Sequence, residues 1–558
     1  MGTKQDHITK YLGPWPDGLI TRHEGSYDVA ESFLHDVINL DVTDYGVLVS
    51  RPGFVRFHDS WGDGWPASFV NYGPLRLLGS YPTAVSAGNL RLYLSQLELR
   101  AGSWMEDVFF TDDPTTGSPT LLFSNNHGAS EPGTGVLFKQ VVLYNGKLYF
   151  IRNNQAGAGA FINNVVMDNG DSTGATAVGS GGSQAFGYYA FTMQDRMFVV
   201  DINGSKVNYS KATDPLTWAA PDGGFFNVSP ADAQQITAVI ALEDIVYFFK
   251  EDSTWAFTFN TDPTVDGILR QVAKNFGAFD ATNNGSDIYI VNRYGCYSFV
   301  DGQFINIAQN INTILHAQIS WDKDCSITVV DERLIIGCIF ETGSFSSLCM
   351  NMRTGAWTKY APVDFAIGPT SKRSYAVAAT GGEAFMVWGD FVSAVQEDNL
   401  DSGTGYLSMM RIGSTLSDPD NKCRDQDRLG ITYVPQYTMV TVPLALDDPT
   451  RWKKLFRWRF DVQHSDFDNE DNFFSVQVRE GDPDVVDFSD AMTEYKGFYT
   501  DFFESTKLRQ RRFRVIQFGL NKPSDTTDIQ AGPGIDQASS FRVRGLAMEY
   551  AIKGPFRN

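Results

Sequence analysis

Carboxylates beside tryptophans are the residues of this sequence that could most directly do chemistry. Asp63 lies between Trp61 and Trp65, and Asp112 is followed by Asp113. Acid–base chemistry on a sugar needs two carboxyl groups at a defined separation across a cleft. Carboxylate pairs are also common in the turns of any acidic β protein, and we favour this structural interpretation over catalysis. A carbohydrate-active protein is kept as the alternative.

Two loops resemble ligand-binding motifs and depart from them at the residues that matter. The glycine-rich stretch 170–182 lacks the lysine of a phosphate-binding loop and is flanked by strand-like sequence. The alternating carboxylates of 466–470 resemble a calcium loop. However, Asp471 and Gln477 stand where an EF-hand needs glycine and glutamate. We predict that 170–182 forms a surface loop and that 466–470 forms a solvated hairpin tip.

Histidines and cysteines form no recognisable site. The seven histidines are scattered, and none lies in an HExxH motif or in a pair spaced for zinc. The five cysteines are odd in number and lack CxxC spacing, which favours buried free thiols in a reducing compartment. The sequence therefore predicts no catalytic residue, no cofactor and no metal. The cysteines are Cys296, Cys325, Cys338, Cys349 and Cys423.

Charge and hydropathy exclude several classes of partner. The 558 residues carry a formal net charge of −21, with a sequence pI near 4.7. A protein that wraps the phosphate backbone of nucleic acid, or binds an anionic membrane, needs clustered Lys and Arg instead. The first ten residues are polar, so we expect no secretory signal, and no apolar run is long enough for a membrane-spanning helix.

Short apolar runs that follow polar turns dominate the chain, so we predict an all-β protein. Seven nearly continuous apolar strands each follow a turn rich in Asn, Asp or Gly, at a spacing of roughly 43–58 residues. That spacing is typical of four-stranded blades, and we predict a central β-propeller of about six to eight blades. The strands are 90–94, 148–151, 197–200, 245–249, 288–291, 334–336 and 384–388.

Two regions fall outside this repeat, and the expected domains follow from them. Residues 1–70 form an N-terminal arm with first strands, 71–420 the propeller-like domain, and 421–558 a C-terminal β-sandwich-like domain. The best helical candidate is the short segment 29–38. In Lys454–Phe460, alternation predicts that Phe456, Trp458 and Phe460 share one buried face, with the arginines on the other.

The arm contains the segment Asn39-Leu40-Asp41, which is followed by a turn and then by Arg51-Pro52-Gly53-Phe54. This order resembles the N-terminal signature of the tail tubular protein B, or nozzle, family of short-tailed bacteriophages. Segments 245–255, 295–299 and 541–550 resemble the same family. Locally, Pro52 fixes φ and Gly53 permits a positive φ, which predicts a turn towards the first blade.

The resemblance implies a structural virion protein and not an enzyme. Members of that family build a six-fold tube below the portal and adaptor rings, so we expect a homo-hexamer in the virion tail. We also expect tail fibre or tip proteins as partners, and passage of phage DNA without specific binding. Synthesis would take place in the host cytoplasm. The expected bore is acidic, because Asp and Glu repel phosphate. The alternative is a glycan- or receptor-binding propeller at the tail. The expected assembly contacts are Arg51, Pro52, Gly53, Phe54, Arg457, Arg459, Arg512 and Arg514.

Overall fold

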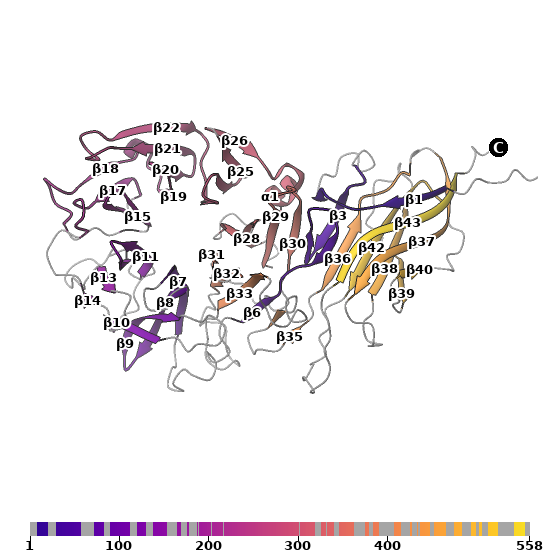
Figure 1. Ribbon diagram of the computed structural model, residues 1–558, viewed down its shortest axis with the longest axis horizontal. Helices are drawn as coiled ribbons and strands as arrows, with labels where there is room; N and C mark the ends of the chain where they lie inside the picture. The colour runs from indigo at the N-terminus through magenta and orange to yellow at the C-terminus, as the bar shows by residue number, and fades with distance from the viewer. Residues whose placement is uncertain are drawn as a thin grey trace, which may run out of the picture.

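The computed structural model consists mostly of short antiparallel strands (Figure 1). Among the residues that the structure describes, the helices are α1 (Asn312–Ala317) and two 3₁₀ turns, η3 (Pro230–Asp232) and η4 (Gln309–Ile311). Within the described residues, which are given next, no helix has the length and apolar character needed to cross a membrane. The described residues are 8–20, 30–56, 72–82, 90–111, 120–129, 138–152, 165–168, 176–177, 187, 189–201, 204–215, 217–300, 302–317, 325–330, 332–339, 345–361, 374–378, 383–389, 407–413, 425–426, 432–433, 436–446, 451–464, 474–481, 493–497, 502–504, 512–522 and 541–552.

Groups of four antiparallel strands follow one another through the middle of the chain. The first three groups are β7 (Tyr72–Pro82), β8 (Leu90–Arg100), β9 (Ser103–Thr111) and β10 (Thr120–Gly128); β11 (Phe138–Tyr144), β12 (Lys147–Arg152), β13 (Val165–Asp168) and β14 (Thr176–Ala177); and β15 (Tyr189–Met193), β16 (Arg196–Val200), β17 (Lys206–Tyr209) and β18 (Gly224–Asn227). The next three are β19 (Ile236–Leu242), β20 (Ile245–Lys250), β21 (Ser253–Thr258) and β22 (Ile268–Lys274); β23 (Asp280–Asn283), β24 (Ile288–Asn292), β25 (Gly295–Val300) and β26 (Gln303–Asn306); and β27 (Ser326–Val330), β28 (Arg333–Ile339), β29 (Phe345–Asn351) and β30 (Trp357–Tyr360).

A further group takes one of its strands from the arm. It contains β31 (Ser374–Ala378), β32 (Glu383–Gly389), β33 (Leu407–Gly413) and, beside β33, β6 (Phe54–Arg56). The pairing of β6 with β33 sets Phe54 opposite Met410 and Arg56 opposite Ser408. An N-terminal strand therefore forms the outer edge of a sheet whose other strands lie more than 300 residues later.

The apolar strands predicted from the repeat occupy equivalent places in these groups. Each predicted strand lies in the second strand of its group, in β8, β12, β16, β20, β24, β28 or β32. All five residues of β16 and of β24 are buried. A strand covered on both faces needs apolar side chains at every position, which is why the signal in the sequence is a continuous apolar run.

The groups are arranged in a ring (Figure 1). The first strand of each group contacts the first strand of the next, in the order β7, β11, β15, β19, β23, β27 and β31, and β31 contacts β7. Side chains also cross between neighbouring groups. Thr237 Oγ1 in β19 donates to the Ala278 carbonyl at 2.5 Å, and Asp280 Oδ2 in β23 accepts the N–H of Ile327 in β27 at 2.9 Å. These two partly buried hydrogen bonds connect the fourth group to the fifth and the fifth to the sixth.

The C-terminal region forms two facing sheets. One contains β36 (Tyr437–Thr441), β42 (Val515–Lys522), β38 (Phe474–Gly481) and β39 (Thr493–Gly497). The other contains β4 (Leu40–Val42), β5 (Leu48–Ser50), β43 (Phe541–Ile552), β37 (Lys453–His464) and β40 (Phe502–Glu504), with β1 (Ile8–Leu12) beside β43 and β41 (Arg512–Phe513) beside β37. Trp458 of β37 packs against Phe518 of β42, with ring centroids 6.0 Å apart. We call this part the sandwich. A separate pair, β34 (Asp425–Gln426) and β35 (Thr432–Tyr433), completes the described strands.

The arm joins the ring to the sandwich through a continuous sheet of ten strands. Strands β2 (Gly18–Leu19) and β3 (Phe33–Ile38) lie between β30 of the ring and β36 of the sandwich. Strand β2 pairs in parallel with both β3 and β30, and β3 pairs antiparallel with β36. The predicted boundaries at 70/71 and 420/421 stay a prediction, but residues 8–56 contribute strands to three different sheets.

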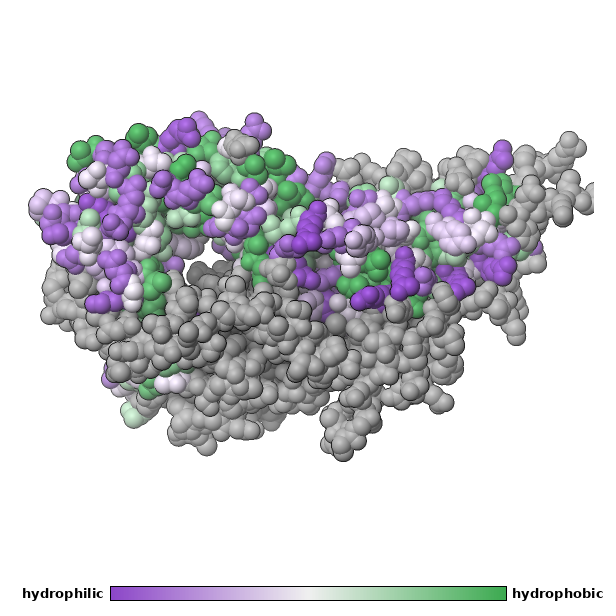
Figure 2. All heavy atoms as spheres, viewed as in Figure 1, coloured by the Kyte–Doolittle hydropathy of each residue, from purple (hydrophilic) through white to green (hydrophobic). Residues whose placement is uncertain are grey.

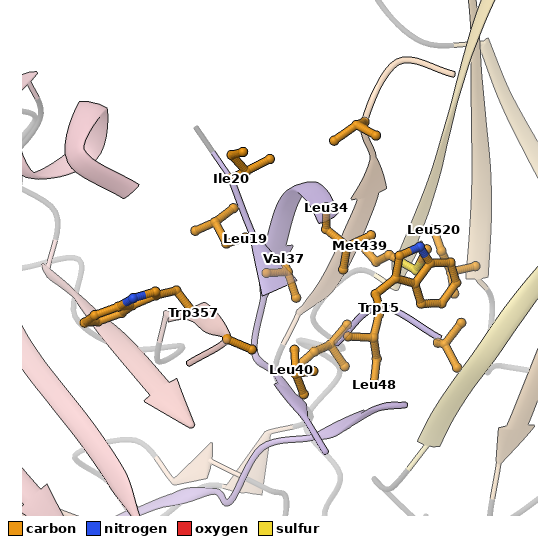
Figure 3. Close-up of a cluster of buried hydrophobic side chains, with 14 of the residues drawn as sticks. Trp15, Leu19, Ile20, Leu34, Val37, Leu40, Leu48, Trp357, Met439 and Leu520 are labelled. Carbon is orange, nitrogen blue, oxygen red and sulfur yellow. The ribbon is translucent and has the colours of Figure 1, made fainter. Parts of the chain in front are cut away.

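One hydrophobic core runs through the same connection (Figure 3). It joins Trp15 and Leu34 of the arm to Trp357 of the ring and to Met439 and Leu520 of the sandwich. All five side chains are almost completely buried. Burying an aliphatic or aromatic side chain of this size contributes about 1.5–3 kcal/mol. The arm is therefore held to both parts by apolar packing as well as by strand pairing.

Two local predictions are wrong. The segment predicted as a helix contains strand β3 over Phe33–Ile38, because backbone pairing on both sides outweighs a short helical pattern. Phe456 does not share the buried face of Trp458 and Phe460. A β-bulge leaves Phe456 without an opposite residue between Leu455, opposite Tyr550, and Arg457, opposite Glu549, so the alternation restarts after it.

Candidate functional site

The segment that carries the family resemblance forms a buried polar junction. Asn39 lies between β3 and β4 with φ of 60°, and there the chain passes from the ten-stranded sheet to the second sheet of the sandwich. Asparagine tolerates this left-handed conformation better than most residues. Arg51 follows β5 and is completely buried. We refer to Asn39, Asp41, Arg51, Arg333 and Tyr360 as the arm junction.

The amide of Asn39 connects ring, arm and sandwich. Its Nδ2 donates to the carbonyl of Ala361, just after β30, at 2.9 Å, and to the carbonyl of Gln436, just before β36, at 2.6 Å. Its Oδ1 accepts the N–H of Ala361 at 2.8 Å and the Nε–H of Arg51 at 2.7 Å. An apolar side chain here would leave four polar groups without this partner, each at a cost in stability.

Arg51 is held inside its own chain. Besides Asn39, its Nη1 donates to the Pro52 carbonyl at 2.7 Å, and its guanidinium lies 5.7 Å from the centre of the Tyr360 ring. Gly53 is buried too. It is not one of the glycines with a positive φ, so the expected positive φ at this position is wrong. These contacts of Arg51 are therefore all with its own chain. The predicted contact of segment 51–54 with another subunit stays a prediction.

Asp41 forms the ionic half of the junction. Its Oδ2 accepts hydrogen bonds from Arg333 Nη2 at 3.0 Å and Nε at 3.3 Å, and its Oδ1 accepts one from the Tyr360 hydroxyl. Burial, and then the Asp41 charge, hold the pKa of Tyr360 well above its usual value. Burial also lowers the pKa of Arg333, but Asp41 outweighs this and raises it. Tyr360 and Arg333 therefore keep their protons across the ordinary pH range.

Further ion pairs surround the junction at the surface. Lys359 Nζ lies 2.9 Å from Asp36 Oδ1, and Arg353 lies 3.0 Å from Asp44 Oδ2 and 2.6 Å from Glu332 Oε1. The Arg353 side chain is more than half exposed, so solvent screens its two ion pairs and they add little to stability. They align the arm on the ring, whereas the buried contacts supply most of the stability.

The basic residues predicted at the assembly surface lie on the sandwich. Arg457 is exposed on β37 and pairs with Glu549 of β43, and Arg459 is half-buried on the same strand. Arg514 lies with its guanidinium 5.3 Å from the centre of the Trp452 ring. Arg512 belongs to β41 and pairs with Lys454 along the backbone. None of these residues joins the arm junction.

Other sequence candidates lie elsewhere. Trp61, Asp63, Trp65, Asp112 and Asp113 fall outside the described residues, as do the calcium-like segment 466–471 and most of the glycine-rich stretch. Cys296 and Cys349 are buried and Cys325 is half-buried, all as free thiols. Within the described ranges, no group of three or more His, Cys, Asp or Glu side chains is placed to hold a metal ion.

Sequence reasoning missed a buried acid–imidazole pair in the first sheet. Glu106 Oε2 lies 3.1 Å from His127 Nε2, and both side chains are at most 3% exposed. The other oxygen, Oε1, accepts the N–H of Phe138 in β11 at 2.8 Å. The pair therefore links the first and second sheets of the ring, and substrate has no access to it. Its partners are up to 32 residues apart, and no motif marks them.

Comparison with known proteins leaves the family open. No protein-family model matches the chain, and no curated protein matches it. Among solved structures, the AfRom2 CNH domain is 7% identical, with a TM-score of 0.36 over 62% of this chain and 98% of that one. A structure from a study of two prolyl endopeptidases is 11% identical, with a TM-score of 0.37 over 67% and 55%. Apo AztD from Citrobacter koseri is 10% identical, with a TM-score of 0.33 over 62% and 96%. Likenesses this weak say nothing about function.

Proposed function

We propose that this chain is a structural subunit of a short-tailed phage tail, forming the nozzle ring or tube through which DNA leaves the capsid. In this role it is a virion protein that docks to the portal and adaptor side and to tail fibres or the tip. The chain contributes shape and contacts, with no catalytic step.

The observation that carries the proposal is the location of the family-like segment. Residues 39–54 contain the Asn-x-Asp and Arg-Pro elements, and these residues hold the ring and the sandwich together. A tail subunit must transmit force between its neighbours without its own parts separating. Buried hydrogen bonds, a shared core and a shared sheet at one place suit that requirement.

We further propose that the ring is a seven-bladed β-propeller. Six blades are formed by β7 to β30, and the seventh by β31, β32 and β33 with β6 as its outer strand. A propeller protects its edges by closing on itself, and a blade that combines N- and C-terminal strands closes the circle. The cyclic contacts of the inner strands support this count.

Electron microscopy of the purified chain tests the proposal. We expect closed rings or tubes of several copies with the sandwiches repeated around an axis, and the same particles stacked on the neighbouring portal or adaptor ring. The acidic charge predicts that such rings release duplex DNA freely at low salt, which a gel-shift assay measures. Solitary particles that bind a glycan and make no ring would contradict the proposal and favour the alternative.

A further inference from the structure

Asparagine followed directly by glycine is a pair that can react without an enzyme. Glycine carries no side chain to crowd its backbone nitrogen, so this nitrogen can attack the side-chain amide carbon of the asparagine before it. The sequence contains four such pairs, at 145–146, 169–170, 203–204 and 284–285. The structure describes both residues of the first pair and of the last. These two pairs lie in equivalent turns, between the first and second strands of their groups.

The turn of Asn145 and Gly146 joins β11 to β12. Tyr144 lies opposite Lys147, so these two residues alone form the turn. Asn145 has a φ of 48° and Gly146 a φ of 72°, as the type I′ turn of a two-residue hairpin requires. Both residues are exposed, and a Cβ added at Gly146 would meet nothing within 4 Å. The two reacting groups are therefore open to solvent.

Few contacts hold the reacting atoms of this turn. The Asn145 amide interacts with the hydroxyl of Tyr144. Among the described residues, none forms a hydrogen bond with Oδ1 of Asn145 or accepts the N–H of Gly146. Figure 2 shows hydrophilic side chains over much of the visible face of the ring, so water, the co-reactant, has ready access to that surface.

The side chain of Asn284 is held much more firmly. Its Oδ1 accepts hydrogen bonds from the N–H of Ser286 at 3.0 Å, from Oγ of Ser286 at 3.1 Å and from the N–H of Asp287 at 2.7 Å. Its Nδ2 donates to the hydroxyl of Tyr289 at 3.3 Å. The amide that would react is therefore bonded at both its oxygen and its nitrogen.

The attacking nitrogen of the second turn is bonded as well. The N–H of Gly285 donates to Oδ1 of Asn283 at 3.1 Å. Ring closure needs this nitrogen to lose its proton and the Asn284 side chain to leave its partners, so these bonds must break first. Each broken hydrogen bond costs free energy, and an opening that breaks more of them is populated less. The same dipeptide is therefore protected in one turn and open in the other.

We propose that Asn145 is a site of spontaneous deamidation and that hydrogen bonds protect Asn284 from the same reaction. When the β11–β12 turn opens, the Gly146 nitrogen loses its proton to hydroxide and bonds to Cγ of Asn145. The bond from Cγ to Nδ2 breaks and ammonia leaves, which closes a five-membered succinimide ring. Water then opens the ring at either carbonyl and leaves aspartate or isoaspartate. The whole sequence consumes one water and releases one ammonia.

The isoaspartate product alters the contact between the second and third groups. It adds one carbon to the backbone of a two-residue turn, and such a turn sets the register of its hairpin. Tyr144 then loses its place opposite Lys147. The Tyr144 hydroxyl donates to the Asp195 carbonyl at 2.5 Å, and its ring lies in the core that joins the two groups. Ageing of one exposed turn therefore loosens the ring. This inference goes beyond the proposed function and does not depend on it.

Peptide mapping by mass spectrometry measures the reaction in the folded, full-length chain. Incubation in mildly alkaline water enriched in oxygen-18 adds one labelled oxygen to each product, which marks conversion during the experiment. Asn145 should convert at least about tenfold faster than Asn284, because the Asn284 turn must break several more hydrogen bonds. In urea the two sites should convert at similar rates, since the dipeptides are identical.

Two variants release the protected site. Asn283→Ala frees the N–H of Gly285, and Ser286→Ala removes one hydrogen bond to Oδ1 of Asn284. Each variant should accelerate the reaction of Asn284 several-fold and leave that of Asn145 unchanged. Circular dichroism melting curves that match the wild type establish that each variant is folded.

An Asn145→Asp variant separates the effect of charge from that of the altered backbone. It carries the charge of the deamidated chain without the additional carbon, so it should melt like the fresh wild type. Aged chain that contains isoaspartate at this position should melt at a lower temperature. Aged chain that melts like Asn145→Asp would refute the loosening of the ring.

Three results would overturn the proposed site. The first is equal rates at Asn145 and Asn284 in the folded chain, or a faster rate at Asn284. The second is an intact Asn145 in the folded chain under conditions where the chain in urea deamidates. The third is an unchanged rate at Asn284 in both releasing variants, which would remove hydrogen bonding as the cause of protection.

Discussion

Replacement of Asn39 by alanine measures how much the arm junction contributes to stability. The substitution removes four hydrogen bonds, two to Ala361 and one each to Gln436 and Arg51. At about 1 kcal/mol each they sum to about 4 kcal/mol. Alanine at a φ of 60° adds about 1 kcal/mol, because its Cβ crowds the following carbonyl. We expect a loss of about 5 kcal/mol in the free energy of unfolding.

Urea denaturation followed by tryptophan fluorescence is the assay, since Trp15 and Trp357 are buried beside the junction. The matched control is Asn275→Ala. Asn275 has a φ of 58° but is exposed, so the control should lose only the backbone contribution of about 1 kcal/mol. If both variants lose the same amount, the side-chain contacts of Asn39 contribute nothing and the role assigned to the junction is refuted.

The other predictions concern the ring, its connection to the arm and its thiols. Gly18→Ala should destabilise the chain by about 2–4 kcal/mol in the same assay, because a Cβ at a φ of +66° would lie 2.8 Å from the Trp357 carbonyl oxygen. The control is Gly102→Ala, at a φ of +81° with nothing within 4 Å of the added Cβ, which should cost about 1 kcal/mol. Equal losses in the two variants would count against close packing of β2 on β30. Burial opposes ionisation of Asp232, but hydrogen bonds from Lys250, 2.7 Å away, and from the N–H of Gln234, together with the Lys250 charge, outweigh it and lower the pKa of that carboxyl below its usual value. The pair therefore stabilises the fold above about pH 4 and less as the pH falls further, so Asp232→Asn should flatten the acid limb of a stability–pH curve, and an unchanged limb would contradict the pairing. Burial, followed by the Asp41 charge, raises the pKa of Cys349 to about 12, so this thiol should resist Ellman's reagent at pH 8 until urea unfolds the chain, and rapid reaction of Cys349 in the folded protein would show that it is accessible.

The sequence was sufficient to predict the repeated strands but not their partners in the arm. A strand such as β16, buried over its whole length, leaves a continuous apolar run after a polar turn, and that signal is local. The pairing of β3 with β36 joins Leu34 to Thr441 across about 400 residues, and no local pattern encodes it. No local sequence pattern predicts the parallel pairing of β2 with β30 either, because only one residue of each strand faces the other.

The arm junction shows the same division. Asn39, Asp41 and Arg51 stand out because their order resembles a family signature, and Arg51 looks like a surface residue from its charge alone. Its burial depends on Asn39, Ala361 and Tyr360, which folding brings from distant parts of the chain. The bulge at Phe456 was missed because strict alternation gives no sign of an extra residue.

The position of β6 has a consequence for biosynthesis. The hydrogen-bonding partner of this strand, β33, is made about 350 residues after it. Until β33 has been made, β6 lacks this partner, and contacts of such long range form slowly. The group formed by β31, β32, β33 and β6 is therefore completed only after synthesis has passed β33, and a nascent chain stalled before that point would expose unpaired strand edges that invite aggregation.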